Sequence, residues 1–398
     1  MSVNSMNFEQ SAAFLSSLYA EATGQQPYIQ IANTADFTSV ATTLLQMGYD
    51  PIISALSQVL NKTIFSIRPY NAKFTSIEVD SQRWGAITRK INFLDTALDS
   101  ADERLTLVDG SSVDHYVVKK PKTLQTNFYG ATQYQDHITI FKDQLDSAFE
   151  DAGQFGRFLA GVMQNLTDKL EQVRESEARS VLINFITSIA DVGGAQYINV
   201  LQAYKDETGT SLTPANMFAL SNYSDFVRWL AGFLVTLQDR MAQRSQLYHF
   251  NITGSKVMRH TPANRMKRLI SANVANYLST MVNSNLYNPE KLNGFLNEAE
   301  KVTYWQNINE PWSAEATPTY LDTSNGRLIT QSTPVLVENI FGVLADEEAC
   351  GITRMSTWTA STPLNAAGGY TNMYFHHTQK TWNDFTENFV VLYADTPT

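Results

Sequence analysis

The chain has 398 residues, enough for two or three lobes, since a single hydrophobic core stops growing near ~250–300 residues. Its net charge is −10 and only 17% of its residues are charged, so it has no basic arm that would grip nucleic acid by charge and its surface is polar but largely neutral. A single cysteine, Cys350, excludes an internal disulfide framework, and the absence of a signal peptide pattern or of an apolar run of ~18 residues indicates a cytoplasmic protein without a membrane span.

The first 62 residues predict short helices joined by loops. Apolar residues recur with helical spacing over Phe8–Leu18 and Val40–Leu45, and Asp50-Pro51 pairs an N-cap residue with a proline in the first helical turn. Such short helices cannot form a core of their own. We expect them to lie on another element or on another subunit.

Between residues 63 and 142 the sequence pattern changes from helical to strand-like. β-branched and aromatic residues alternate with polar ones in short runs at 63–68, 86–93, 113–118 and 137–141, and Asp109-Gly110 is a turn signal. Few apolar residues lie between these runs. The segment therefore predicts a long two-stranded excursion or a small sheet that folds poorly alone and packs on a partner.

A long helix is predicted from Phe155 to about Ile189. Its apolar residues recur at i, i+3, i+4 and i+7, and no proline interrupts them. At 1.5 Å per residue this helix is about 50 Å long, far beyond the usual ~11–12 residues, and Gly193-Gly194 follows it as a C-cap signal. We expect it to be the spine of the molecule.

The next lobe mixes helices and strands without a regular βαβ rhythm. Thr213-Pro214 and Thr261-Pro262 predict helix starts, with Met266 to Tyr277 as the apolar stripe of the second helix. Residues 247–252 predict a strand. The turn-rich segment 310–332 predicts a surface loop or flap.

The chain ends in strands, predicted at 335–343, 352–359, 371–375 and 385–393. In the last of these, Phe389 and Val391 lie on one face and Val390 and Leu392 on the other. Apolar residues on both faces are typical of a strand that is buried on both sides.

The search for chemistry finds no site. No spacing of histidines, Cys350 and carboxylates resembles a metal site, and there is neither a phosphate-binding loop nor a nucleophile elbow. Cys350 follows three acidic residues within four positions, which disfavours a thiolate. We therefore predict no catalytic, cofactor-binding or metal-binding residues and no cofactor, and this mildly favours a structural protein.

Charge is segregated along the chain. From Arg240 to Pro289 there are seven basic residues and no Asp or Glu. This run is either a solvated positive face or a contact surface for acidic patches on neighbouring copies. Both interpretations remain open from the sequence.

The order of elements resembles the major capsid proteins of tailed bacteriophages, which have the Hong Kong 97-type (Johnson) fold, and among them those of small short-tailed, podovirus-like phages. The resemblance covers nearly the whole chain and rests on element order, without a diagnostic motif. It implies an α+β fold in five parts. These are a helical N-terminal arm (1–62), an extended β excursion or E-loop (63–142), a peripheral domain with the spine helix (143–194), an axial domain that includes the loop 310–332 (195–345), and C-terminal strands that return to the peripheral domain (346–398).

The resemblance also implies a function. A capsid protein of this family self-assembles as pentamers and hexamers into an icosahedral or prolate shell around double-stranded DNA, which it contacts without sequence preference. It is assembled in the bacterial cytoplasm and resides in the virion, with scaffold, portal and decoration proteins as candidate partners and no membrane. Candidate inter-subunit contacts in this sequence are Arg83, Trp84, Arg259, Arg265 and Arg268.

Three alternatives accompany this hypothesis. One is an enzyme with dispersed catalytic residues, for which Asp346, Glu347 and His376 are the first candidates. Another is a cellular compartment-shell protein with the same fold but without a genome. The third is a portal or another head or tail component of a phage.

Overall fold

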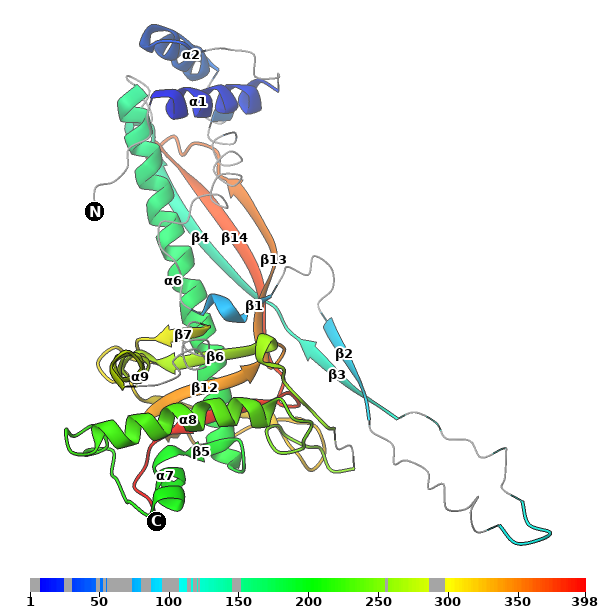
Figure 1. The fold of residues 1–398 in the computed structure, drawn as a ribbon. Helices are drawn as coiled ribbons and strands as arrows, with labels where there is room; N and C mark the ends of the chain where they lie inside the picture. Colours follow the sequence, from blue (N-terminus) through cyan, green and yellow to red (C-terminus); the bar gives the residue numbers. More distant parts are fainter. Residues whose placement is uncertain are drawn as a thin grey trace.

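The computed structural model describes residues 8–24, 31–47, 51–52, 55, 74–79, 87–94, 107–112, 116, 120, 122–144, 152–254, 257–285 and 298–398. Figure 1 shows an elongated upper part along a long helix, a lower lobe of further helices and strands, and a β-ribbon that projects sideways from the junction of the two. Within these residues no helix is long and apolar enough to cross a membrane.

The long helix is α6 (Ala152–Val192), with 41 residues and therefore a length of about 60 Å. This confirms the predicted spine and extends it by three residues at each end. Along its upper half runs a four-stranded sheet in the order β1-β13-β14-β4. Its strands are β1 (Glu78–Val79), β13 (Cys350–Ser361), β14 (Tyr370–Asn383) and β4 (Thr132–Phe141).

The helices α1 (Phe8–Thr23) and α2 (Thr34–Gln46) confirm the predicted N-terminal helices. Leu15 and Phe37 from these helices share a buried cluster with Met373 and Phe375 of β14, and Leu170 of α6 packs against it. Because successive residues of a strand point to opposite faces, Met373 and Phe375 face this cluster while the residues between them face the other way. One face of the upper sheet is thus covered by helices.

The lower lobe contains a five-stranded sheet in the order β5-β15-β12-β6-β7. Its strands are β5 (Tyr197–Asn199), β15 (Phe389–Tyr393), β12 (Ile340–Asp346), β6 (Met266–Ser271) and β7 (Ala299–Val302), and its helices are α7 (Val200–Thr208), α8 (Tyr223–Met241) and α9 (Ala272–Asn285). Val390 and Leu392 pack with these three helices, whereas Phe389 and Val391 pack with α6. The prediction of a last strand buried on both faces is confirmed.

Segment 310–332 is more ordered than the predicted surface loop. It contains β8 (Ala314–Ala316), β9 (Thr319–Leu321) and β10 (Leu328–Thr330), with β8 paired to β11 (Val335–Val337). The side chain of Asn184 on α6 donates to the Thr319 carbonyl at 3.0 Å and accepts from its N–H at 2.9 Å. These bonds, together with burial of Ala314 and Tyr320, fix the segment against the spine.

Three local predictions are wrong. Residues 247–252 form no regular strand, because Tyr248, His249 and Phe250 are all buried in an irregular segment whose backbone bonds to Phe385 and Phe389. Residues 266–270 belong to β6 and not to a helix. β6 lies between β12 and β7, and Lys267 and Arg268 interrupt its apolar residues, so that Met266, Leu269 and Ile270 fall at the i, i+3, i+4 spacing of a helix.

The third error concerns Thr213-Pro214, which lies in a series of turns; α8 begins only at Tyr223. After Thr261-Pro262 comes a short 3-10 helix, Ala263–Arg265, and not the predicted helix. Predicted strands at 63–68 and, apart from residue 116, at 113–118 lie outside the described residues. β4, which had been assigned to the excursion, joins the upper sheet beside β14.

Candidate assembly surfaces

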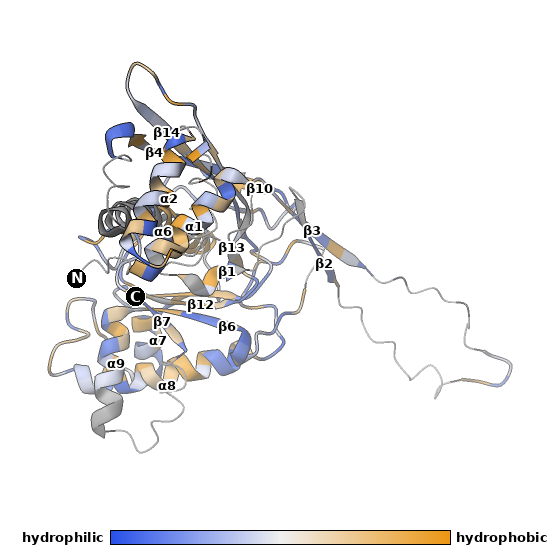
Figure 2. Cartoon of the chain, turned by 90° about the horizontal axis from the view of Figure 1, so that it is seen from above, coloured by the Kyte–Doolittle hydropathy of each residue, from blue (hydrophilic) through white to orange (hydrophobic). Residues whose placement is uncertain are grey.

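The ribbon consists of β2 (Ile87–Phe93) and β3 (Thr123–Tyr129), which pair antiparallel from Ile87 opposite Tyr129 to Phe93 opposite Thr123. It extends away from the body in both views (Figures 1 and 2). Phe93 is 71% exposed, Tyr129 67% and Ile91 57%. An isolated two-stranded ribbon is marginally stable in water, and these exposed apolar side chains would gain stability from a partner surface.

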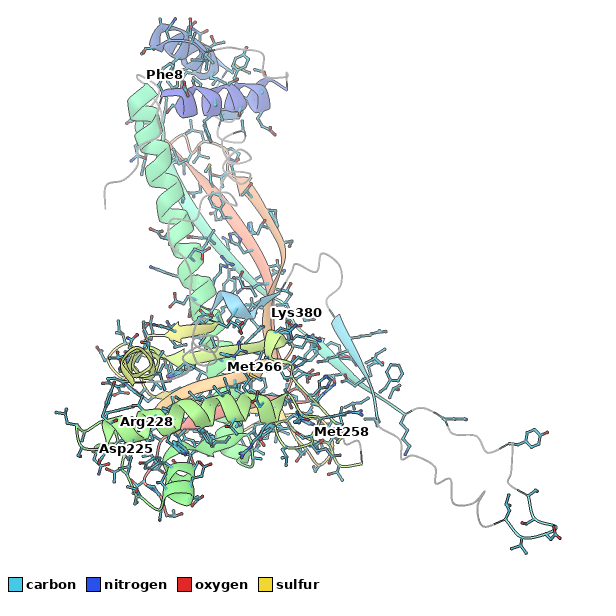
Figure 3. All side chains as sticks on the ribbon, viewed as in Figure 1. Phe8, Asp225, Arg228, Met258, Met266 and Lys380 are labelled. Atoms are coloured by element: carbon cyan, nitrogen blue, oxygen red, sulfur yellow. The ribbon has the colours of Figure 1, made fainter. Side chains whose placement is uncertain are left out.

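Charged groups fix the root of the ribbon. Lys90 of β2 lies 2.9 Å from Asp384, 2.5 Å from Glu387 and 3.0 Å from Glu348. From the other side, Lys380 of β14 donates to the Phe128 carbonyl of β3 at 2.7 Å, at the junction of ribbon, upper sheet and lower lobe (Figure 3). Of the residues of β2 and β3 whose side chains are described, none belongs to the buried apolar clusters. The described contacts of this joint are ion pairs and hydrogen bonds.

The electrostatics of the root follow from its burial. Burial lowers the pKa of Lys90, but the carboxylates of Asp384 and Glu387 raise it more, and the net pKa is well above the usual value. Burial raises the pKa of Glu387, and Lys90 and Arg259 offset only part of this effect. Such a cluster tolerates the loss of one partner badly, because a charge is then buried without compensation.

The outer face of the upper sheet carries a row of rings. The Trp358 ring stacks on that of His376, with centroids 3.7 Å apart and planes 9° apart. Tyr374 follows with a centroid 6.4 Å from that of His376, and His137 of β4 stacks on Tyr374 at 5.4 Å. Trp358 is 52% exposed. We call these four residues the ring row; they lie on the face opposite the helices.

The basic segment is largely neutralised within its own chain. Arg259 pairs with Glu387 at 2.9 Å, and Arg265 pairs with Glu347 at 2.5 Å and Glu348 at 2.7 Å. The side chain of Arg268 is only 3% exposed and binds Glu298, Gln238 and the Ala263 carbonyl.

Among the three described contact candidates, Arg265 is therefore the exposed one, at 45% of its side chain. Arg259 and Arg265 both connect to the ribbon root, through Glu387 and Glu348. Arg268 is bound inside its own lobe, so charge reversal there is expected to damage folding as well as assembly. Arg83 and Trp84 lie outside the described residues.

A family model for the Phi29-like phage major capsid protein matches residues 15–393. The chain belongs to this family. It is a capsid shell protein, as the order of its elements had indicated, and the family is a structural one. No curated protein matches the sequence.

Solved structures agree with the fold expected of a capsid protein. A chain of the capsid structure of Staphylococcus phage Andhra is similar with a TM-score of 0.54 at 9% identity, covering 82% of this chain and 86% of that one. A chain in the structure of the head fiber and inner core protein gp22 of native bacteriophage P68 has a TM-score of 0.53 at 10% identity, with coverage of 82% and 86%. The Hong Kong 97-type α+β fold is thereby confirmed.

The candidates for the enzyme alternative do not form a common site in the capsid protein. Asp346 is buried and accepts from the Thr261 hydroxyl at 2.8 Å, and Glu347 pairs with Arg265. His376 lies in the upper sheet, stacked on Trp358, whereas Asp346 ends β12 of the lower sheet. Among the described residues no group of three or more metal-ligating side chains is placed to hold an ion.

Sequence reasoning missed both the ribbon root and the ring row. The root joins residues that are almost three hundred positions apart, as in the Lys90 and Asp384 pair, and no local pattern connects them. The ring row left a weak signal, since Tyr374 and His376 are two residues apart in a strand and must share a face. The partners from β4 and β13 become visible only when the register is known.

Proposed function

We propose that this capsid protein assembles as pentamers and hexamers into a closed icosahedral or prolate shell that encloses the double-stranded DNA of a tailed phage. The observation that carries the proposal is the ribbon, whose exposed Ile91, Phe93 and Tyr129 have no covering surface among the described residues of their own chain. If the ribbon of each copy binds the next copy, and this contact is repeated by rotation, the copies form a closed ring.

In this proposal the parts have the roles expected from the sequence. Residues 1–62 are the N-terminal arm, 63–142 the E-loop apart from β4, 143–194 the peripheral domain, 195–345 the axial domain, and 346–398 the returning strands. Of the returning strands, β13 and β14 join the upper sheet and β15 joins the sheet of the lower lobe. The ring row supports a specific contact, because an aromatic, partly exposed sheet face fits the apolar side chains of a neighbour's ribbon. Arg259, Arg265 and Arg268 stay candidates for contact with a neighbour, and Arg265 has the most exposed side chain of the three.

The net charge of −10 supports a weak, sequence-independent contact between the inner wall and packaged DNA. Assembly takes place in the host cytoplasm with scaffold, portal and decoration proteins as partners. DNA binding by isolated subunits is then weak, and a steep dependence of that binding on salt would contradict this part of the proposal.

The test is assembly of the expressed protein, with its scaffold where one is required, followed by sedimentation and negative-stain electron microscopy. The wild type should form closed particles, and the double substitution Ile91→Ser, Phe93→Ser should remove them while circular dichroism stays unchanged. The matched control Ile91→Val, Phe93→Leu keeps the apolar surface and should assemble. Persistent monomers in the wild type would overturn the proposal. Particles from phage-infected cells without nuclease-protected DNA would favour a compartment shell.

A further inference from the structure

A groove of about 1070 Å³ lies beside the ribbon. Its walls are β3 from Leu124 to Tyr129, the spine helix around Ser180 and Asn184, the β9 and β10 hairpin, and the end of β14 with the residues after it, from Thr381 to Phe385. The groove thus lies beside the ribbon root, to which Asp384 belongs. Its volume is of the order found for sites that bind small ligands or peptide segments, about 300–1,000 Å³.

The groove runs along the edge of β3 and not along one of its faces. Six consecutive residues of β3 line it, whereas none of the residues of β2 with described side chains does. Successive side chains of a strand point to opposite faces, so a groove over one face would touch every second residue only. The groove is therefore on the side of β3 that faces away from β2.

The register shows which backbone groups point into this groove. The Leu94 N–H donates to the Lys122 carbonyl at 2.9 Å, which makes this a hydrogen-bonded pair of the antiparallel ladder. Bonded and non-bonded pairs alternate, so the N–H and C=O of Leu124, Thr126 and Phe128 point to β2. Those of Gln125 and Asn127 point away from β2, and β3 has no second neighbouring strand in the described part of the molecule.

The lining selects the kind of ligand. Most of its residues are amide, hydroxyl or apolar side chains, such as Asn325, Thr253 and Leu328, and Leu328 is 69% exposed. Asp384 is the one charged residue among the described residues that line it, and Lys90 already pairs with it at 2.9 Å. No described lysine or arginine lines the groove, which argues against a phosphate backbone or an acidic peptide. A neutral, extended peptide fits.

We propose that the groove receives an extended segment from a second copy of this chain, which adds a strand to the free edge of β3. This inference rests on the proposed function, because in a closed shell every subunit is in contact with neighbouring copies of the same chain. The 17% content of charged residues makes this chain itself a source of neutral segments. Six residues of β3 offer about 20 Å of edge, and main-chain hydrogen bonds along such an edge are a known means of strand addition.

Amide hydrogen exchange tests the inference directly in free subunits and in shells. The amides of Gln125 and Asn127 should exchange fast in the subunit and at least 100-fold more slowly in the shell. The amide of Thr126, which already bonds to β2, serves as the internal control and should change much less. Equal exchange of the Asn127 amide in both states would overturn the proposal.

Two variants at position 127 distinguish the contribution of the backbone N–H to assembly from that of the side chain. Asn127→Pro removes an outward N–H without removing a bond to β2, and shell yield should fall at least tenfold. Asn127→Ala keeps the N–H and should assemble like the wild type. Equal yields for the two variants would contradict strand addition.

A photo-crosslinker identifies the occupant. With p-benzoylphenylalanine in place of Leu328, irradiated shells should yield a band of twice the chain mass. A crosslink to a scaffold protein or to DNA would overturn the choice of occupant. If the wild type forms no particles, the proposed function fails and this inference with it. If particles form but Asn127 gains no protection, only the inference fails.

Discussion

Replacing Lys90 with methionine should release the ribbon from the body of the subunit. The substitution keeps the length of the side chain but leaves Asp384, 1% exposed, and Glu387, 8% exposed, without their shared cation. Removal of one partner of a buried ion pair costs roughly 3–5 kcal/mol. Asp384 still accepts from the Thr386 N–H and hydroxyl, and Glu387 keeps Arg259, so we expect the lower limit, about 3 kcal/mol.

Because a tenfold change in an equilibrium constant corresponds to about 1.4 kcal/mol, this loss should increase opening of the ribbon about 100-fold. Hydrogen exchange measured by mass spectrometry on peptides that cover 87–94 and 122–129 should show an increase of this order. Peptides from 181–189 of α6, buried in the lower core, should not change. Lys122→Met is the matched control, because Lys122 is exposed on the same ribbon.

An exchange rate in the ribbon of Lys90→Met within threefold of the wild type would refute the reasoning. It would mean that the ion pairs of Lys90 contribute little to holding the ribbon against the body of the subunit.

Three further predictions concern single side chains. Arg268→Glu should reduce the yield of folded subunit, because it places a carboxylate where the side chain is only 3% exposed; its partner Glu298 is 61% exposed, so we expect the lower limit for a buried pair, about 3 kcal/mol. Arg265→Glu should cost under about 1 kcal/mol in folding and act on shell yield. Equal effects on soluble yield would contradict the difference in burial. Burial raises the pKa of Glu177 to about 7 from 4.5, and its Oε2 has no partner among the described residues, so the stability of the subunit falls as pH rises from about 4.5 through 7. At pH 8 the variant Glu177→Gln should therefore have a higher urea midpoint, by the equivalent of about 1 kcal/mol after a discount for the partial exposure of Glu177. At pH 4 the midpoints of variant and wild type should be equal. Burial raises the pKa of Cys350 to about 11, against a lowering by Lys267, so a thiol reagent at pH 8 should label it only in urea; rapid labelling of the native subunit would show that the site opens.

The parts of the fold that local patterns determine were predictable. The stripe from Phe155 to Ile189 predicted α6, and the continuous apolar run around Val390 predicted a strand buried on both faces. β6 was not predictable in this way, because Lys267 and Arg268 interrupt its apolar residues and leave the others at helical spacing. The segment around His249 was not predictable either, since three consecutive buried residues require tertiary partners that the local sequence does not name.

The candidate surfaces were less predictable than the fold. The run of basic residues from Arg240 suggested a surface for neighbours, but Arg259 and Arg268 find their acids within the chain, at Glu387 and Glu298. Those acidic residues are distant in sequence from the arginines, so the distribution of charge along the chain could not predict these ion pairs. The free edge of β3 is likewise a property of register, and register depends on which strand is the neighbour.

The spine helix α6 contacts two separate buried clusters, one around Leu170 and one from Ala178 to Ile189. One element thus sets the distance between the N-terminal helices and the lower sheet. A rod of about 60 Å converts a tilt of about 5° at its base into a displacement of about 5 Å at its far end, which is close to the ~4.8 Å spacing between neighbouring strands. A small difference in tilt between two subunits would therefore displace the N-terminal helices by about the distance between neighbouring strands. The curvature of a wall built from such subunits would then determine which residues of the N-terminal helices meet the next subunit.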